Sequence, residues 1–319
     1  MHKWIAITAT VGALAAASLL CNAALAALPG GDAERYDNKA FDQDRQELVT
    51  EERFPFAADG TVDVESGRGS IAVTGWDKPE VQLVATRTLN ENRGFIGLIT
   101  GGRISKERAL ELLEGVAVET TASDDALRVR AHFDSNYTEP EVGLRLELRV
   151  PRATYLKLSA RNGQVSVNDI DASMDVATHN GALEIEDVAG PVRARTVNGH
   201  LRLAAVRGDI SAETGNGAIE CLQAEGAVSL ETTNGSIETT GTQGGLLTCR
   251  TTNGHIAVTL DRDSARTVDL RTVRGSVDCA LPLDAPTDTQ DNLLCATVRG
   301  GGPMVALQTV NGSISLDEE

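Results

Sequence analysis

Cysteines are the residues of this 319-residue chain best suited to redox or metal chemistry. Cys21 lies in the N-terminal apolar segment, and Cys221, Cys249, Cys279 and Cys295 follow in the second half. The spacing contains no CxxC pair, which argues against zinc. By their place in the repeats described below, the last four are expected to face the core. Either they stay buried thiols, as free cysteines often do, or Cys279 and Cys295 form a disulfide across the core in an oxidising compartment.

Carboxylates recur at one outward position of the repeats and could act as a hydrolytic pair. The members of this column are Glu184, Glu220, Glu238 and Asp278. Polysaccharide-cleaving enzymes place carboxylates on one face in this manner, but Arg202 and Ala257 interrupt the column. The short turns also provide no long insertions to wall a cleft. The pattern therefore favours a solvated charged face over a carbohydrate-active enzyme.

The histidines do not cluster in the sequence. His200 and His255 hold the same position after a turn but lie three repeats apart, whereas metal ligands must converge on one ion. The chain contains no GxSxG, HExxH or P-loop motif. We expect a protein that is not an enzyme and that has no catalytic residues, cofactor or metal site.

An Asn-Gly pair returns at a nearly constant interval and organises the second half of the chain. Four successive intervals are 18 residues and the fifth is 19. The pairs are Asn162-Gly163, Asn180-Gly181, Asn198-Gly199, Asn216-Gly217, Asn234-Gly235 and Asn253-Gly254. A fixed period of this length predicts stacked structural units.

The same frame continues in altered form towards both ends of the chain. Arg68-Gly69 opens the series, Arg274-Gly275 and Arg299-Gly300 replace Asn-Gly near the end, and Asn311-Gly312 closes it. Threonine stands two residues before most of these turns. We expect the three arginines to be surface charges at places where a ladder of Asn side chains stops.

Each unit supplies two segments in which apolar and polar residues alternate, which predicts strands with one buried side. Asn-Gly favours positive φ and is also the strongest two-residue hairpin signal, so an antiparallel meander or a β-sandwich is the alternative fold. A meander with one apolar face would need a second layer, which the chain does not offer. We therefore predict an all-β fold, a two-sided parallel β-solenoid (β-helix) of repeats of about 18 residues, in which apolar faces cover each other. Aromatic residues are only 3% of the chain, which suits a narrow core.

The chain divides into three parts by composition. Residues 1–26 combine Lys3, an apolar run and Ala24-Leu25-Ala26, as is typical of a secretory signal peptide. Residues 27–53 are polar and predict a flexible acidic leader. Residues 54–319 are expected to form the repeat domain, irregular over 54–158 and regular over 159–319. A helix is predicted over 105–114, with Ser105 as its N-cap and Gly115 as its stop, and it is expected to cap an open end or edge.

The formal net charge of −17 at pH 7 disfavours nucleic acid as a partner. After the signal peptide, no apolar run approaches the roughly 20 residues that a membrane helix needs. We expect an exported protein, either periplasmic or secreted to the cell surface, with no membrane span in the mature chain.

Several motifs together resemble one known family. They are the opening segment 62–76, the helix, the strand end Leu148-Arg-Val-Pro151 and the tandem Asn-Gly-x-apolar-x-apolar units. Over residues 54–319 the chain resembles the bacterial "putative adhesin" domain family, secreted repeat proteins of unknown function. The resemblance implies a β-helix-like fold and an envelope location, and it carries no catalytic residues.

Three functional hypotheses follow from these patterns. The first is a non-enzymatic exported scaffold, adhesin-like, that binds a protein or glycan of the envelope or of the extracellular space. The second is a periplasmic accessory protein in regulation or envelope stress. The third is a carbohydrate-active β-helix enzyme, which the interrupted acidic column disfavours.

Overall fold

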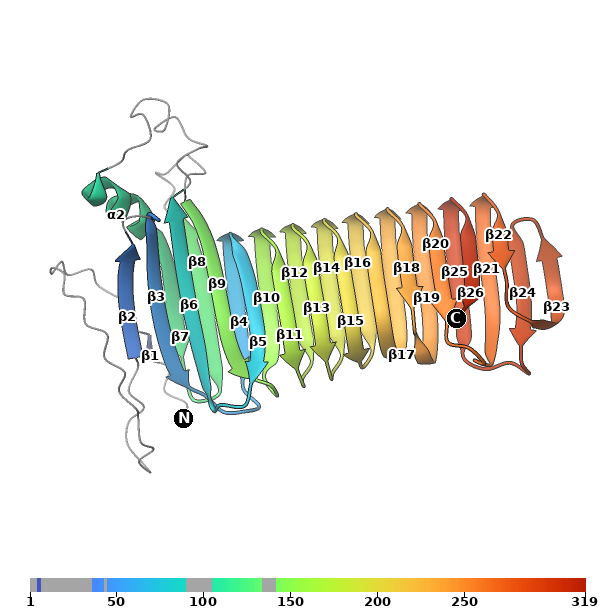
Figure 1. The fold of residues 1–319 in the computed structure, drawn as a ribbon, viewed down its shortest axis with the longest axis horizontal. Helices are drawn as coiled ribbons and strands as arrows, with labels where there is room; N and C mark the ends of the chain where they lie inside the picture. The colour runs from blue at the N-terminus through green and yellow to red at the C-terminus, as the bar shows by residue number, and fades with distance from the viewer. Residues whose placement is uncertain (1–4, 7–35, 43–44, 90–104, 134–141) are drawn as a thin grey trace.

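The computed structural model describes residues 5–6, 36–42, 45–89, 105–133 and 142–319. Apart from β1 (Ile5–Ala6), the signal peptide expected over 1–26 lies outside the described residues, as does the leader up to residue 35. The described chain consists of strands and one short helix (Figure 1). The strands join one large mixed sheet, and the all-β class is confirmed.

The middle of the chain is built from two sets of strands that alternate along the sequence. Pre-turn strands precede an Asn-Gly turn and are β10 (Tyr155–Asn162), β12 (Met174–Asn180), β14 (Val192–Asn198), β16 (Ile210–Asn216), the second half of β17 (Ile219–Asn234) and β19 (Gln243–Asn253). Post-turn strands follow a turn and are β11 (Val165–Ile170), β13 (Leu183–Val188), β15 (Leu201–Arg207), the first half of β17, β18 (Ile237–Thr240) and β20 (Ile256–Leu260).

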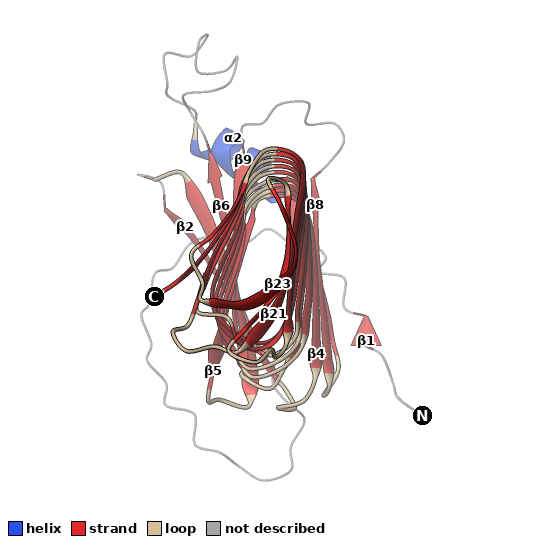
Figure 2. Cartoon of the chain, turned by 90° about the vertical axis from the view of Figure 1, so that its right-hand side faces the viewer, coloured by secondary structure: helices blue, strands red, loops and turns tan. Residues whose placement is uncertain are grey.

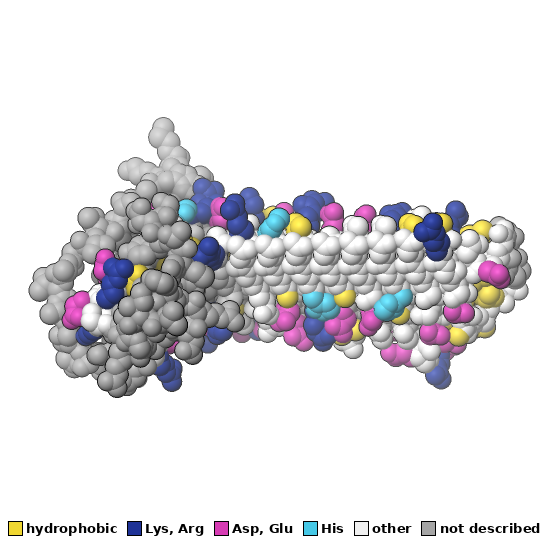
Figure 3. Space-filling model, turned by 90° about the horizontal axis from the view of Figure 1, so that it is seen from above, with side chains coloured by type: hydrophobic (Ala, Val, Ile, Leu, Met, Phe, Trp, Pro, Cys, Tyr) yellow, Lys and Arg dark blue, Asp and Glu magenta, His cyan; other side chains and the backbone are white. Residues whose placement is uncertain are grey.

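Neighbouring strands of each set pair in parallel, and each residue lies beside its equivalent one unit further along. Asn180 thus pairs with Asn198, and Leu183 pairs with Leu201. Because the strands advance by one unit at each step, the units line up along the long axis of the molecule (Figure 1). Viewed along that axis, the two sets form facing walls (Figure 2). The Asn-Gly turns join them in an uncharged strip along one edge (Figure 3).

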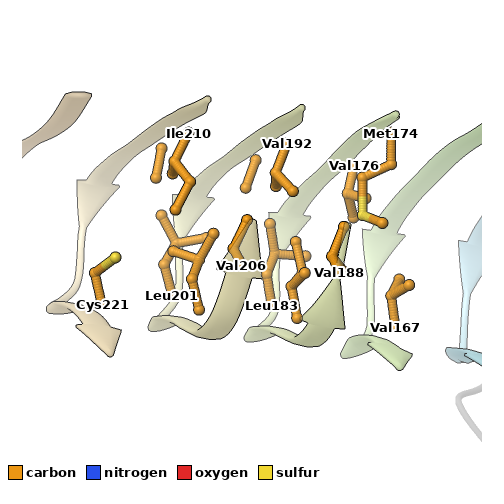
Figure 4. Close-up of a cluster of buried hydrophobic side chains, with 14 of the residues drawn as sticks. Val167, Met174, Val176, Leu183, Val188, Val192, Leu201, Val206, Ile210 and Cys221 are labelled. Carbon is orange, nitrogen blue, oxygen red and sulfur yellow. The ribbon is translucent and has the colours of Figure 1, made fainter. Parts of the chain in front are cut away.

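The core is a narrow layer between the two walls. Leu183, Ile185, Leu201 and Leu203 are at most 1% exposed on the post-turn side, and Val192 faces them from the pre-turn side at 2%. The side chains of Leu183 and Leu201 point towards that of Val192 from the other set of strands (Figure 4). Equivalent residues of successive units stack on each other, so Val, Ile, Leu and Ala fill this layer without large aromatic groups. Apolar burial of this kind stabilises by about 25 cal/mol per Å².

The N-terminal end departs from the order of the sequence. β4 (Thr61–Arg68) and β5 (Ser70–Trp76) pair in parallel with β10 and β11. On their other side they pair with β8 (Ala126–Phe133) and β9 (Val142–Pro151). The first repeat of the chain therefore lies inside the stack, and a later segment covers it.

The outermost strands at this end pair antiparallel. They are β2 (Tyr36–Asp42), β3 (Glu47–Pro55), β6 (Glu80–Leu89) and β7 (Val116–Ala122). The flexible leader predicted over 27–53 is therefore wrong for 36–42 and 47–53. β3 buries Leu48 and Phe54, and the Gln82 amide of β6 donates to Glu51 at 2.6 Å. Backbone pairing with β6 stabilises a polar strand that shows no apolar alternation in its sequence.

The predicted helix is confirmed as α2 (Lys106–Glu114). The Ser105 side chain accepts a hydrogen bond from the backbone N–H of Arg108, and Gly115 ends the helix. Ala109, Leu112 and Leu113 pack in a small cluster with Leu48 of β3 and Leu89 of β6. The helix therefore covers the sheet end nearest the N-terminus (Figure 1). No helix in the described part of the chain is long and apolar enough to span a membrane.

The C-terminal end is also out of sequence order. Its strands are β21 (Arg266–Arg274), β22 (Val277–Cys279), β23 (Leu283–Gln290), β24 (Leu293–Val298), β25 (Met304–Asn311) and β26 (Ile314–Glu318). β25 pairs in parallel with both β19 and β21, and β26 pairs with both β20 and β22. The last unit of the chain therefore lies between two earlier ones. β24 and β23 add an antiparallel hairpin beyond β21.

A charged cluster holds the reordered N-terminal strands together. Two guanidinium nitrogens of Arg130, on β8, donate to the two carboxylate oxygens of Asp63, on β4, at 3.2 and 3.1 Å. Burial by itself would raise the pKa of the Asp63 carboxyl, but the hydrogen bonds and charge of Arg130, with the charges of Lys157 and Arg128, lower it below its ordinary value. The lowered pKa means that ionised Asp63 stabilises the folded state.

We expect Asp63→Asn to lower the free energy of unfolding by about 1 to 3 kcal/mol at pH 7, because it removes a charge-assisted pair. The contribution is present above the unfolded pKa, about 3.9, and is lost as pH falls through the lowered folded pKa. Urea unfolding at pH 7, 5 and 3 should therefore show a difference from wild type that shrinks below about pH 4. Asp77→Asn is the control, because the Asp77 side chain is 87% exposed and such pairs contribute little. An Asp63→Asn deficit that is independent of pH would contradict this account.

Candidate functional site

The Asn side chains of successive turns form one hydrogen-bonded ladder. Each Nδ2 donates to the Oδ1 of the preceding Asn in the stack, at 2.8 to 2.9 Å. The ladder runs through Asn162, Asn180, Asn198, Asn216, Asn234, Asn253 and Asn311. Asn311 follows Asn253 directly, although 58 residues separate them, because β25 pairs with β19. The structure thus brings the predicted Asn turns into one line.

The threonine that stands two residues before most of the turns binds the turn of the neighbouring unit. Thr214 is 2% exposed, and its Oγ1 donates to the carbonyl oxygen of Gly199 at 3.1 Å. The same bond recurs for Thr178, Thr196, Thr232, Thr251, Thr272 and Thr309. A buried carbonyl needs such a donor, so this threonine column has a structural role.

The turn glycines are needed because successive turns approach each other closely. A Cβ atom on Gly199 would lie 1.9 Å from the carbonyl oxygen of Gly181. Equivalent contacts of 1.9 to 2.1 Å occur at Gly163, Gly181, Gly217, Gly235, Gly254, Gly275 and Gly312. The Asn residues of the turns are not among the described non-glycine residues with positive φ. The expected positive φ therefore lies on the glycine in several turns, with values of 151 to 158° at Gly217, Gly254, Gly275 and Gly312. Close packing between turns is a second reason for this glycine.

Two of the three arginines at turn positions lie where the ladder stops. Arg68 pairs with Asn162 and Arg274 pairs with Asn311, and both are exposed, as expected. Arg299-Gly300 does not belong to this series, and its assignment as a turn of the repeat was wrong. The strand before it, β24, runs antiparallel to β21. Arg299, which follows β24, therefore lies at the edge opposite the Asn-Gly turns. Arg299 there binds Glu318 at 2.8 Å.

A second column of special backbone positions was missed from the sequence. At the opposite edge, Asp169, Asp187, Ala205 and Gln223 have φ values of 53 to 67°, and Gly241 continues the series at 68°. These residues stand 18 positions apart. Left-handed backbone is uncommon outside glycine. The residue types at these positions do not predict it, because they differ from unit to unit. The spacing alone could have revealed the column.

The acidic column considered for catalysis is interrupted as the sequence predicts. In the stack, Glu184 is followed by Arg202, Glu220 and Glu238, and then by Ala257. Ser315 then separates Ala257 from Asp278. The Arg202 guanidinium lies 2.6 Å from a Glu220 carboxylate oxygen. Glu220 and Glu238 are thus direct neighbours, with Glu220 paired to Arg202, whereas the other carboxylates of the column are separated by other residues.

The histidines lie beside this column on separate units. His200 Nε2 is 3.9 Å from a Glu220 oxygen, and His255 Nε2 is 3.4 Å from a Glu238 oxygen. Within the described ranges, no group of three or more His, Cys, Asp or Glu side chains could hold a metal ion.

The four cysteines of the described chain are free thiols. Cys221 and Cys249 are buried in the core. Cys279 packs partly against the core, whereas Cys295 lies on the other face of β24, where its Sγ is 3.6 Å from an Asp269 oxygen. The expected inward position of Cys295 was wrong, because Leu294, Ala296 and Val298 take the buried places of its strand. The Cys279–Cys295 disulfide is accordingly not formed in the structure.

The outer sides of the two walls differ in charge. The post-turn side is dominated by acids, Glu184, Glu186, Asp187, Glu220, Glu225 and Glu238, beside Arg202 and Arg207. The pre-turn side mixes acids with more bases, which are Lys157, Arg161, Arg193, Arg195, Arg250 and Arg271. Figure 3 shows basic side chains along one flank of the uncharged strip and mainly acidic ones along the other.

A shallow groove of about 510 Å³ crosses the outer side of the pre-turn strands. It runs over six neighbouring strands, from Tyr155 on β10 to Leu246 on β19. Tyr155 is 37% exposed and Leu246 is 48% exposed. Between them the lining includes Pro191, the bases Arg193 and Arg250, and the acids Asp175 and Asp209. The groove is the candidate functional site, because it gathers exposed apolar and charged groups in one hollow.

The groove arginines differ from their neighbours in pairing. Arg195 lies 3.7 Å from Glu213, and Arg271 lies 2.6 Å from Asp269. Within the described part of the chain, no ion pair forms for Arg193 or Arg250. These two exposed guanidinium groups are therefore available to an anionic group in the groove. The groove leaves no signal in the sequence, because it is formed by outward positions of different units.

Comparisons with known proteins add names but little detail. No protein-family model matches the chain, and no curated protein matches it. Among solved structures, the chain is similar to a putative adhesin from Bacteroides fragilis, with 11% identity, a TM-score of 0.44, and coverage of 84% of this chain and 96% of that one.

A putative cell adhesion protein from Clostridium sporogenes matches with 10% identity and a TM-score of 0.26, covering 90% of this chain and all of that one. A putative adhesin from Parabacteroides distasonis matches with 9% identity and a TM-score of 0.31, covering 85% and 97%. The Bacteroides fragilis and Parabacteroides distasonis proteins are both called putative adhesins, the name of the family that the sequence motifs resemble. Likeness at this level carries no argument about function.

We expect Gly199→Ala to lower the free energy of unfolding by about 3 kcal/mol or more, because its Cβ would collide with the neighbouring turn. Thermal unfolding followed by circular dichroism measures the effect, and loss of soluble protein is its extreme form. Gly67→Ala is the matched control, since a Cβ there meets no heavy atom within 4 Å. Equal melting curves for the two variants would contradict the close-packing explanation.

We expect Cys221 and Cys249 to resist alkylation in the native protein. Burial raises the pKa of the Cys221 thiol to about 12 and raises the pKa of Cys249 as well, with a smaller contribution from Cys221. At pH 8 only about one Cys221 thiol in ten thousand would be ionised, and the thiolate is the reactive form. Iodoacetamide labelling mapped by mass spectrometry should modify half-buried Cys295 first, and all four only after unfolding. Native labelling of Cys221 at the rate of Cys295 would contradict this.

Proposed function

We propose that residues 54–319 form a two-sided parallel β-solenoid that serves as a non-enzymatic, adhesin-like binding scaffold outside the cytoplasm. Its binding surface is the groove on the pre-turn strands. The observation that carries the proposal is the groove itself, which spans six strands in register and contains two arginines without an ion pair in the described chain.

The regular spacing of the strands supports an extended ligand. Successive strands lie about 4.8 Å apart, and each presents its outward side chains at equivalent positions. A polymer lying along the stack can therefore make the same kind of contact on several units. A single small molecule would use only part of the hollow between Tyr155 and Leu246.

The lining contains Asp175 and Asp209 beside its two arginines, and the arginines favour a ligand that carries carboxylates or other anionic groups. Arg193 and Arg250 can each bind a carboxylate through two parallel hydrogen bonds. Tyr155 offers an aromatic face with a polar tip, and Pro191 and Leu246 add apolar contact. Hydroxyl groups of Ser211, Ser229 and Thr248 line the space between. An acidic extended polymer of the envelope or of the extracellular space, either glycan or protein, fits this chemistry.

Export is supported by the sequence alone. Lys3, the apolar run from Trp4 to Leu20 and Ala24-Leu25-Ala26 have the order of a signal peptide. A binding role, in preference to hydrolysis, is supported by the acidic column, where Arg202 pairs with Glu220. A carboxylate held in such a pair is already occupied by the guanidinium and is not free to act on a substrate.

The test is binding of the purified protein to a panel of acidic and neutral envelope and host polymers, measured by biolayer interferometry. We expect binding to acidic members, weakened by salt. The double variant Arg193→Ala, Arg250→Ala should lose about tenfold or more in affinity, because each arginine meets an anionic group.

The matched control is the double variant Arg161→Ala, Arg207→Ala, which removes two exposed arginines outside the groove. It should bind as wild type does. Equal losses in both variants would indicate general charge attraction, and unchanged binding in the groove variant would refute the site.

A further inference from the structure

The last unit of the chain, β25 and β26, is inserted between units that are neighbours in sequence. Val305 and Leu307 of β25 lie between Leu247 and Cys249 on one side and Val268 and Leu270 on the other (Figure 1). Ile314 of β26 likewise lies between Ile256 and Val277. The slot that holds this unit is therefore built mainly from residues 243–280, because Ala280 also donates a backbone hydrogen bond to Leu316.

The unit on the far side of the slot carries the same frame as the inserted unit. Thr309 donates to the carbonyl oxygen of Gly254 at 3.0 Å, and Thr272 donates to that of Gly312 at 2.8 Å. Arg274-Gly275 takes the same place on Asn311-Gly312 as Asn311-Gly312 takes on Asn253-Gly254. Either unit therefore matches the surface of the unit that contains β19 and β20.

Two features allow the rest of the C-terminal end to fold whether or not its own β25 and β26 are in place. Arg266, at the start of β21, donates to the carbonyl oxygens of Gly245 and Thr242 at 3.0 Å, so 266–279 is anchored to the earlier unit independently of β25. The interval from Asn253 to Arg274 is 21 residues, close to the repeat length. Removal of β25 and β26 thus leaves a matching neighbour beside β19 and β20.

A glycine-rich linker attaches the inserted unit to β24. Residues 299–303 are Arg-Gly-Gly-Gly-Pro, and Gly300 and Gly301 have φ values of 83 and 82°. Glycine permits many backbone conformations at such a joint. The last residues of the unit are held by Arg299, which binds Glu318, and by Arg262, which binds the Glu319 backbone oxygen at 2.6 Å. All of these contacts can form equally well when 304–319 comes from another molecule.

We propose that the C-terminal unit 304–318 is exchangeable between copies of this chain, so that a second copy can fill the slot and link two molecules. Identical elements swapped between protomers make the same contacts in both arrangements, and the connecting hinge decides which forms. The partner is a second copy of this chain, and the contacting surfaces are the edges of β19, β20, β21 and β22. This assembly stands or fails independently of ligand binding in the groove.

The test uses two full-length variants with one added cysteine each. Ala257 and Ser315 are direct partners across β20 and β26, and adjacent strands suit the Cα separation of a disulfide, about 4.4 to 6.8 Å. Ala257→Cys and Ser315→Cys copies are mixed, unfolded, refolded together at high concentration and oxidised. We expect a covalent dimer in which peptide mapping finds the thiol introduced at position 257 of one copy joined to the thiol introduced at position 315 of the other.

The matched control pairs Glu184→Cys with Arg202→Cys, which are also direct partners on neighbouring parallel strands but belong to units stacked in sequence order. It should give no cross-link between copies. A second measurement does not need the added cysteines: a tagged wild-type chain should retain untagged chain after joint refolding, but not after mixing of folded proteins. Absence of the link between the two introduced thiols together with no retained chain overturns the proposal, as does equal linkage in the control pair.

Discussion

The structure depends on how closely the backbones of neighbouring turns approach. At Gly199 the space for a side chain is taken by the carbonyl oxygen of Gly181, 1.9 Å from where a Cβ would stand. That carbonyl accepts the buried hydroxyl of Thr196, and the Asn beside each glycine bonds to the Asn of the next turn. One geometric constraint thus selects three residue types at each turn. It also sets the register of every strand that enters or leaves the turn, because a shift by one residue would place a side chain in the contact.

This constraint explains why the regular part of the fold could be predicted. A residue type that must recur for steric reasons leaves a period in the sequence, and the 18-residue interval of Asn-Gly revealed the unit, its two strands and its buried sides. The helix was equally predictable, because Ser105 and Gly115 give local signals at its ends. The physical role of the glycine was harder to assign, since the same dipeptide suits a hairpin turn. Only the pairing of neighbouring strands distinguishes a turn packed on the next unit from the turn of a hairpin.

The ends could not be predicted in the same way, because a repeating frame does not specify which copy lies beside which. Asn311 lies between Asn253 and Arg274, two turns that come before it in sequence, and β4 lies between β8 and β10. Any unit with the frame fits any other, so the order follows from linkers and from the strands at the edges. β3 shows the related difficulty at the N-terminal edge. Its polar sequence has no alternation, and its place is set by backbone pairing with β6 and by side-chain contacts such as Gln82 with Glu51.

The same constraint separates structure from recognition on the surface. The residue types at inward positions and at turn positions are restricted in every unit. Outward positions, such as that of Arg193 on one wall or that of Glu184 on the other, contact only solvent and other outward side chains of the same wall. Changes there alter the charge of a wall without disturbing the stack, which explains how one wall can be acidic while the other presents arginines to a groove. A groove made of such positions leaves no periodic signal, because its members need not resemble each other. A binding surface of this fold must therefore be sought among the residues that break the repeat, and at its ends, where the order of the units differs from the order of the chain.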